Sequence, residues 1–114
     1  MYRITGKSAD AERFWAEALS LDRVAKYLRR LAEGTFPTHD ELAAAPTFER
    51  FMFIGAPHTI CMGAMTNEGE NFETLTYSDE LICDASAKGW ILSRSRLYKV
   101  GVMITNPYDL PEAR

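Results

Sequence analysis

The residues with the widest chemical repertoire in this chain are two histidines and two cysteines, and their spacing fits no established metal site. His58 and Cys61 stand three positions apart, whereas His39 and Cys83 lie far from them in the sequence. Zinc needs four convergent nitrogen or sulfur ligands, usually in closely spaced pairs. Residues three apart on a strand face opposite sides of a sheet. We therefore expect no metal and no other cofactor.

A catalytic site would need a nucleophile beside a base, or two carboxylates in a cleft. Cys61 with His58, or Ser95 with His39, supplies the residue types, but neither pair stands in a motif with a required structural context. Cysteine also commonly serves as a small apolar core residue. We therefore expect the protein not to be an enzyme.

A basic and aromatic segment near the C-terminal end is a candidate nucleic-acid surface. If 90–100 is one uninterrupted strand, alternate positions share a face, and these are Trp90, Leu92, Arg94, Arg96, Tyr98 and Val100. Bases stack on aromatic rings while guanidinium groups meet phosphates. The candidate nucleic-acid-binding residues are Arg94, Arg96, Tyr98 and Lys99.

The competing interpretation of this segment is that its apolar residues point into the core and its arginines lie at a solvated edge or beside a bulge. The formal net charge of the chain is −3, whereas nucleic-acid-binding domains are usually strongly basic. The charge therefore favours the competing interpretation.

Acidic residues gather in and after the segment 67–71, which carries the clearest turn signal of the chain. They are Glu68, Glu70, Glu73, Asp79, Glu80 and Asp84. A field of one sign steers association with a basic partner, although such a run also solubilises a turn and protects a sheet edge. As the partner-binding surface we predict Glu68, Glu70, Glu73, Tyr77 and Tyr98.

The first part of the chain has helical periodicity. Apolar residues recur there at alternating spacings of four and three, as Phe14, Ala18, Leu21, Ala25, Leu28 and Ala32, and the stripe is widened by Trp15, Val24 and Leu31. This pattern is typical of an amphipathic helix with one buried face, and we expect that face to cover a sheet. Ser20 is a candidate break, and Gly34 and Pro37 end the helix.

The rest of the chain predicts a second helix and then a sheet. Thr38 and Glu41 form a capping box that opens a short helix, and Pro46 ends it. Strands are predicted at 48–55, 59–65, 72–77, 81–85 and 90–100. Hydrophobic residues at 46% and charged residues at 25% are ordinary globular values.

We therefore predict a single α+β domain over 1–114. Residues 1–8 form an arm, 9–46 the helical part, 48–105 the sheet and 106–114 an irregular tail. The N-terminal helix, broken or continuous, and the short second helix pack on an antiparallel sheet of four to five strands.

Several short segments also follow one another in a distinctive order. They are LAEG at 31–34, PT at 37–38 with Leu42, AP at 45–46, CMG at 61–63, SDEL at 78–81, GW at 89–90 and SRLYKVG at 95–101. In the order and spacing of these segments, residues 28–101 resemble a family of small uncharacterised domains found chiefly in alphaproteobacterial genomes and their mobile elements. That family has a histidine in the hairpin turn and a more basic strand near Trp90, whereas this chain has an acidic turn.

The resemblance implies a domain type without an established activity, and its mobile-element setting implies an inhibitor of a host defence or nucleic-acid machine as one version of the function. We expect a small non-enzymatic binding or regulatory protein that acts through protein–protein contact. A nucleic-acid-binding domain is the alternative, and a homodimer through the last strand or the helix stripe is compatible with either. The segment 1–19 lacks the apolar core of a secretory leader, and no run approaches membrane-spanning length. We therefore expect a cytoplasmic protein that does not act at a membrane.

Overall fold

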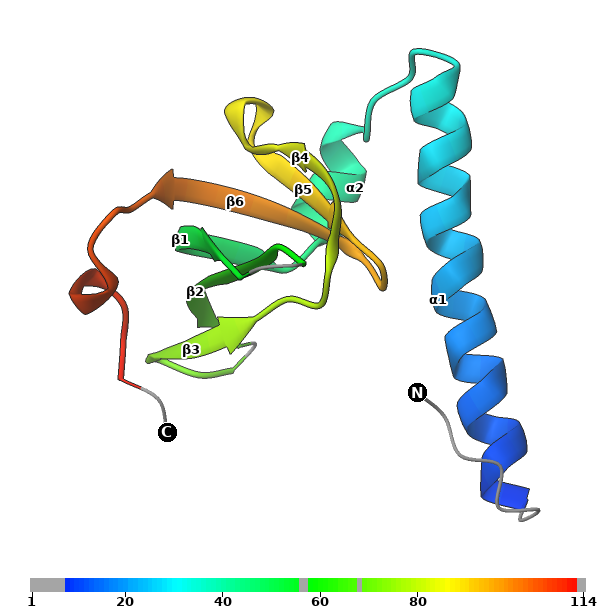
Figure 1. Cartoon of the computed structure of the whole chain (residues 1–114), viewed down its shortest axis with the longest axis horizontal. Helices are drawn as coiled ribbons and strands as arrows, with labels where there is room; N and C mark the ends of the chain where they lie inside the picture. Colours follow the sequence, from blue (N-terminus) through cyan, green and yellow to red (C-terminus); the bar gives the residue numbers. More distant parts are fainter. Residues whose placement is uncertain (1–7, 56–57, 68, 113–114) are drawn as a thin grey trace.

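The computed structural model describes residues 8–55, 58–67 and 69–112. In that part of the chain two α-helices, α1 (Ser8–Ala32) and α2 (His39–Ala44), precede six strands (Figure 1). The strands are β1 (Thr47–Ile54), β2 (Ile60–Thr66), β3 (Glu73–Tyr77), β4 (Leu81–Ala85), β5 (Trp90–Ser93) and β6 (Leu97–Met103). Two 3₁₀ turns, η1 (Ser86–Lys88) and η2 (Pro107–Asp109), follow β4 and β6. Within this part no helix is both long and apolar enough to cross a membrane.

The strands form one mixed sheet in the order β3-β2-β1-β6-β5-β4. Strands β1 and β6 run parallel, with Phe48 opposite Val100, and the other neighbours are antiparallel. The predicted α+β class is confirmed. The prediction of four to five antiparallel strands is wrong, because the described sheet has six strands and a parallel pair at its centre.

The additional strand arises because the segment predicted as one strand, 90–100, is a hairpin. The hydroxyl of Ser93 accepts hydrogen bonds from the amides of Ser95 (3.3 Å) and Arg96 (3.1 Å). A serine hydroxyl that binds amides two and three residues ahead stabilises a tight turn. After this turn the face changes: Trp90 packs with Leu97, whereas Tyr98 belongs to a different apolar cluster. The predicted common face of Trp90, Tyr98 and their alternate neighbours is therefore wrong.

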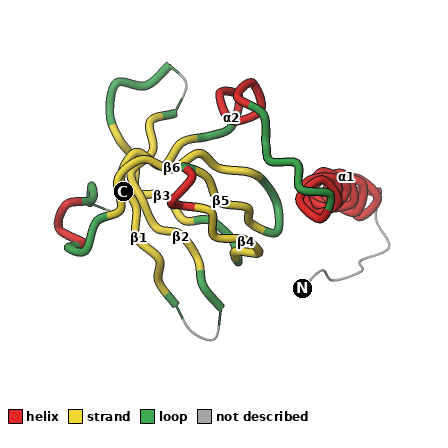
Figure 2. The backbone as a smooth tube through the Cα atoms, turned by 90° about the horizontal axis from the view of Figure 1, so that it is seen from above, coloured by secondary structure: helices red, strands yellow, loops and turns green. Residues whose placement is uncertain are grey.

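Two apolar clusters stabilise the sheet. The first joins four strands and contains Phe48, Phe51, Cys61, Met65, Ile91, Tyr98 and Val100. The second joins the sheet to the helices and contains Val24, Trp90, Leu92 and Leu97, with Tyr27, Leu31 and Leu42 packed against it. The amides of Ser78 and Leu81 donate to the carbonyls of Cys61 and Thr59. The chain between β3 and β4 therefore lies beside β2, and the sheet is strongly curled (Figure 2).

The two helices begin and end largely as predicted. The capping box is present, since the amide of Glu41 donates to the Thr38 hydroxyl (3.1 Å) and the amide of Thr38 donates to the Glu41 carboxylate (2.9 Å). Helix α1 is continuous over 25 residues, so there is no break at Ser20. Residues 1–7 of the predicted arm lie outside the described residues, and the predicted irregular tail contains the turn η2.

The close approach of β6 to β1 gives a stability prediction. A Cβ atom on Gly101 would lie 2.3 Å from the backbone oxygen of Glu49. We expect Gly101→Ala to lower the free energy of unfolding by about 1–3 kcal/mol, because the two central strands must move apart. Urea denaturation measures this, with Val102→Ala at the adjacent exposed position as the control. Equal midpoints for the two variants would contradict the expected close packing.

Candidate functional site

The predicted acidic surface is only partly assembled. Glu68 lies outside the described residues. Within the turn, the carboxylate of Glu70 accepts a hydrogen bond from the side-chain amide of Asn67 (3.1 Å). The carboxylate of Glu73 is engaged by the Arg50 guanidinium through two hydrogen bonds (2.9 and 2.5 Å). Part of the acidic charge is therefore neutralised inside the molecule.

The two tyrosines assigned to that surface have different environments. Tyr77 is exposed on the edge strand β3, whereas Tyr98 is only 8% exposed. The Tyr98 ring packs on Phe48, with 4.9 Å between the ring centroids. Burial raises the pKa of the Tyr98 hydroxyl. The expectation that Tyr98 is an exposed aromatic residue is therefore wrong.

The predicted nucleic-acid residues do not share one surface. Arg94 forms an ion pair with Glu80 (3.1 Å), which also contacts His58 (3.0 Å). The guanidinium of Arg96 lies 5.7 Å from the centre of the Tyr98 ring, so this arginine covers the outer side of the buried tyrosine. Lys99 is exposed and opposite Trp90 in the sheet register. No face of the Tyr98 ring is presented for a base to stack on.

The histidines and cysteines do not converge. Cys61 is fully buried, and burial raises the pKa of its thiol to about 12, which makes it a poor nucleophile. His58 is exposed and points to Glu80 instead. Among the described residues there is no group of three or more His, Cys, Asp or Glu that could hold a metal ion.

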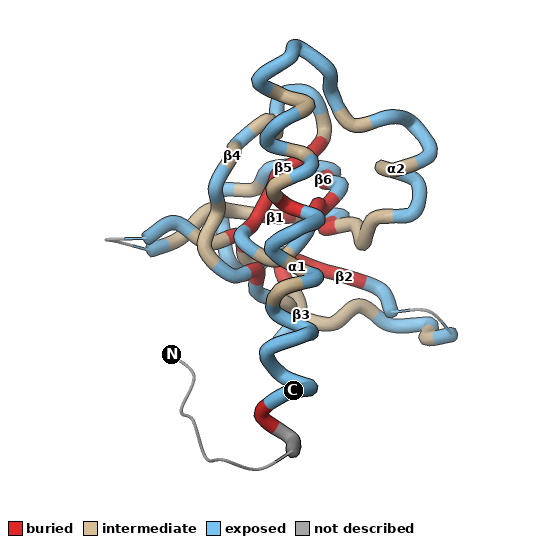
Figure 3. The backbone as a smooth tube through the Cα atoms, turned by 90° about the vertical axis from the view of Figure 1, so that its right-hand side faces the viewer, coloured by how far each residue is buried: buried red, intermediate tan, exposed pale blue. Residues whose placement is uncertain are grey.

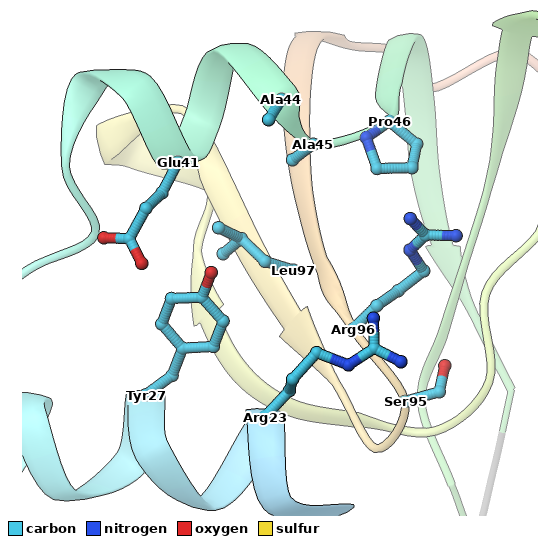
Figure 4. A pocket seen from close by; sticks show the side chains of 9 residues that line it. All are labelled: Arg23, Tyr27, Glu41, Ala44, Ala45, Pro46, Ser95, Arg96 and Leu97. Atoms are coloured by element: carbon cyan, nitrogen blue, oxygen red, sulfur yellow. The ribbon is translucent and has the colours of Figure 1, made fainter. Parts of the chain in front are cut away.

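An open groove of about 250 Å³ lies where α1 and α2 meet the β5–β6 turn (Figure 4). Its lining comprises Arg23, Tyr27, Glu41, Ala44, Ala45, Pro46, Ser95, Arg96 and Leu97. Figure 4 shows both guanidinium groups on the same side of the groove, that of Arg23 toward Ser95 and that of Arg96 beside Pro46. Neither arginine forms an ion pair with another described residue. The groove therefore has a positive side that sequence reasoning assigned only in part, through Arg96.

A bidentate ion pair joins the two helices beside this groove. The two terminal guanidinium nitrogens of Arg30 donate to the two carboxylate oxygens of Glu41, each at 2.7 Å. These bonds, together with the bond from the Thr38 amide, lower the pKa of Glu41 to about 2. The Arg30 guanidinium also lies 5.6 Å from the centre of the Tyr27 ring. This cluster fixes the end of α1 against α2 and the sheet.

Helix α1 presents a row of apolar residues that is not covered by the sheet. We call this row the α1 seam; it consists of Ala11, Phe14, Ala18, Leu21, Ala25, Leu28 and Ala32. None of its members is buried, and the large ones, Phe14, Leu21 and Leu28, are 38%, 47% and 40% exposed. The sheet is contacted instead by Val24, Tyr27 and Leu31.

The prediction that the apolar stripe covers the sheet is right for Val24 and Leu31, which widen the stripe and pack on the sheet. It is wrong for the α1 seam, which the sheet does not cover. At about 100° per residue, the centre of the α1 seam lies roughly 80° around the helix from Val24. The apolar surface of α1 is wider than the sheet needs, and Trp15, 71% exposed, widens it further.

Comparisons with known proteins found no match to this chain among family models, curated proteins or solved structures. The resemblance to the small alphaproteobacterial family stays a prediction. The function of the chain has to be argued from its own surfaces.

The Arg30–Glu41 pair gives a pH prediction. The pKa of Glu41 is lower in the folded protein, about 2, than its ordinary 4.5. The pair therefore stabilises the fold above pH 4.5, and its contribution is lost as the pH falls towards 2. We expect Glu41→Gln to be less stable than the parent protein at pH 7, and the difference to shrink over that acid range.

Urea unfolding at a series of pH values measures this difference. Glu33→Gln, which changes an exposed carboxylate just after α1, is the control and should follow the parent protein at every pH. A constant difference between Glu41→Gln and the parent protein from pH 7 to pH 2 would show that the ionised pair does not contribute.

Proposed function

We propose that this protein is a non-enzymatic binding module that acts through protein–protein contact, with helix α1 as its docking element. The observation that carries the proposal is the exposure of the α1 seam. Scattered exposed apolar residues are normal, but a continuous row of them marks an interaction surface. Phe14, Leu21 and Leu28 form such a row along one line of the helix.

The position of α1 supports the proposal. The helix stands beside the sheet, and much of its length is exposed (Figure 3). The radius of gyration is 15.5 Å, whereas a compact domain of this length would have about 13 Å. Most of the stability of a helix in a protein comes from packing of its apolar face. A partner that covers the α1 seam would supply packing that the sheet does not give.

The spacing of the α1 seam indicates the kind of partner. Its residues alternate at spacings of four and three, which average 3.5 residues. A row with this period faces a second helix along its whole length. The partner we propose is therefore a protein that presents an amphipathic helix. The resemblance described above adds one concrete version, a mobile-element-encoded inhibitor whose target supplies that helix.

The proposal predicts which substitutions abolish partner binding. Leu21→Glu places a charge in the α1 seam, whereas Leu19→Glu makes the same change on another side of the same helix. Both leucines are exposed, so neither change should unfold the protein. We expect capture of a protein partner from lysate of the source organism, after nuclease treatment, to be lost with Leu21→Glu and kept with Leu19→Glu. Equal capture by both variants would contradict α1-seam docking.

A second candidate function, nucleic-acid binding, is favoured by one observation. Arg23 and Arg96 place two guanidinium groups on one side of the groove, and such groups donate hydrogen bonds to phosphate oxygens. Binding of a labelled single-stranded oligonucleotide at low salt would weaken steeply as salt is raised. It would also weaken in the double variant Arg23→Gln, Arg96→Gln. Absence of binding at low salt would remove this candidate.

A further inference from the structure

We infer that helix α1 pairs in antiparallel orientation with α1 of a second copy of this chain. The inference rests on the proposed function, because it names the partner of the same α1 seam. Three features of the helix support it: the alternation of small and large residues, the distribution of charge, and the accessible side on which the seam lies.

The α1 seam alternates strictly between small and large side chains. One position of the repeat is alanine in every case, at Ala11, Ala18, Ala25 and Ala32, and the other is large, at Phe14, Leu21 and Leu28. A parallel pair would place alanine against alanine and leave voids between the large layers. Reversal of one helix exchanges the two positions, so that each of the three large residues meets an alanine and one terminal alanine lies beyond the paired layers. Close packing favours such small-against-large layers.

The charges of α1 are distributed unevenly along its length. The half 8–20 carries three acidic residues and one basic residue, a net charge of −2, whereas the half 21–32 carries four basic residues and one acidic, a net charge of +3. Glu41 neutralises Arg30, and the second half remains basic. In the acidic half Asp10 is buried in an ion pair with Arg13. The attraction in an antiparallel pair therefore comes from the opposite net charges of the two halves and from the opposed helix dipoles, not from individual ion pairs.

The α1 seam lies outside the contact that α1 makes with the sheet. Val24 is buried against Trp90 and Leu92, and the seam lies to one side of that contact. At about 1.5 Å per residue, the helix offers a contact line of roughly 37 Å, or three and a half heptads. Both the volumes and the charges of α1 are matched by the same helix reversed. A two-fold symmetric dimer is the arrangement that uses this self-complementarity.

The oligomeric state of the purified protein tests the inference. We expect sedimentation equilibrium to show a dimer for the parent protein and for Leu19→Glu. Leu21→Glu should weaken the dimer at least about tenfold, because a carboxylate would be buried in an apolar seam. Circular dichroism establishes that the variants are folded. A parent protein that is monomeric at 100 μM, or a dimer that Leu21→Glu leaves unchanged, would overturn the inference.

The orientation of the helices has its own test. Spin labels at Glu12→Cys and at Leu19→Cys lie one heptad apart on the side away from the α1 seam. In a Cys83→Ala background, the remaining Cys61 is buried and should escape labelling. An antiparallel pair centred near the middle of α1 gives a longer label–label distance at position 12 than at position 19. Equal distances would indicate a parallel pair and overturn the inference.

The failure of self-pairing can be told apart from the failure of the proposed function. A monomeric parent protein whose capture of another protein is lost with Leu21→Glu would overturn self-pairing and keep the α1 seam as a docking surface. A monomeric parent protein that captures its partner equally well with and without Leu21→Glu would overturn both self-pairing and docking through the α1 seam.

Discussion

The organisation of this protein depends on a mismatch between the apolar surface of α1 and the apolar surface that the sheet offers it. The sheet presents Trp90, Leu92 and Leu97 to the helix. This patch accommodates Val24, Tyr27 and Leu31 on the C-terminal half of α1, together with Leu42 of α2. A second apolar row therefore runs along the helix beside the contact with the sheet, half exposed along its length. Burial of that row by another molecule would remove apolar surface from water and so stabilise the complex.

The orientation of the helix is maintained by polar contacts as well as by packing. The Arg30–Glu41 pair connects α1 to α2, and the capping box holds the same carboxylate through Thr38. One carboxylate thus stabilises the start of α2 and the end of α1 together. Because α2 leads directly into β1, the direction of α1 is coupled to the central strands. The α1 seam is consequently presented at a defined angle to the sheet.

Local features of the fold could be predicted from the sequence. The helix of residues 8–32, the capping box at Thr38 and the ends of most strands follow from side-chain spacing, caps and turn residues, which act over a few positions. The turn at Ser93 escaped prediction because apolar alternation continues on both sides of it. Its signal was the pair of serines, whose hydroxyls compete for backbone amides.

Long-range features could not be predicted in the same way. The parallel pairing of β1 with β6 joins segments about fifty residues apart, and no local pattern encodes that choice. Whether the acidic and basic residues are exposed depends on partners such as Arg50 for Glu73, which lie on different strands. The periodicity of α1 correctly indicated an amphipathic helix. It did not reveal whether the sheet or another molecule covers each row, because both kinds of contact select apolar residues at similar spacing.

Hydrogen–deuterium exchange at two protein concentrations tests the central claim, that the α1 seam is covered by another helix, most directly. In the single chain Phe14, Leu21 and Leu28 of the α1 seam are 38%, 47% and 40% exposed. A second helix that covers them should make local opening of α1 rarer and slow the exchange of its amides. We predict that exchange in residues 8–20 slows markedly as the concentration is raised from about 1 to about 100 μM, and that Leu21→Glu removes this effect. Exchange in β1 and β6 should stay unchanged. Exchange in α1 that is independent of concentration would contradict the account.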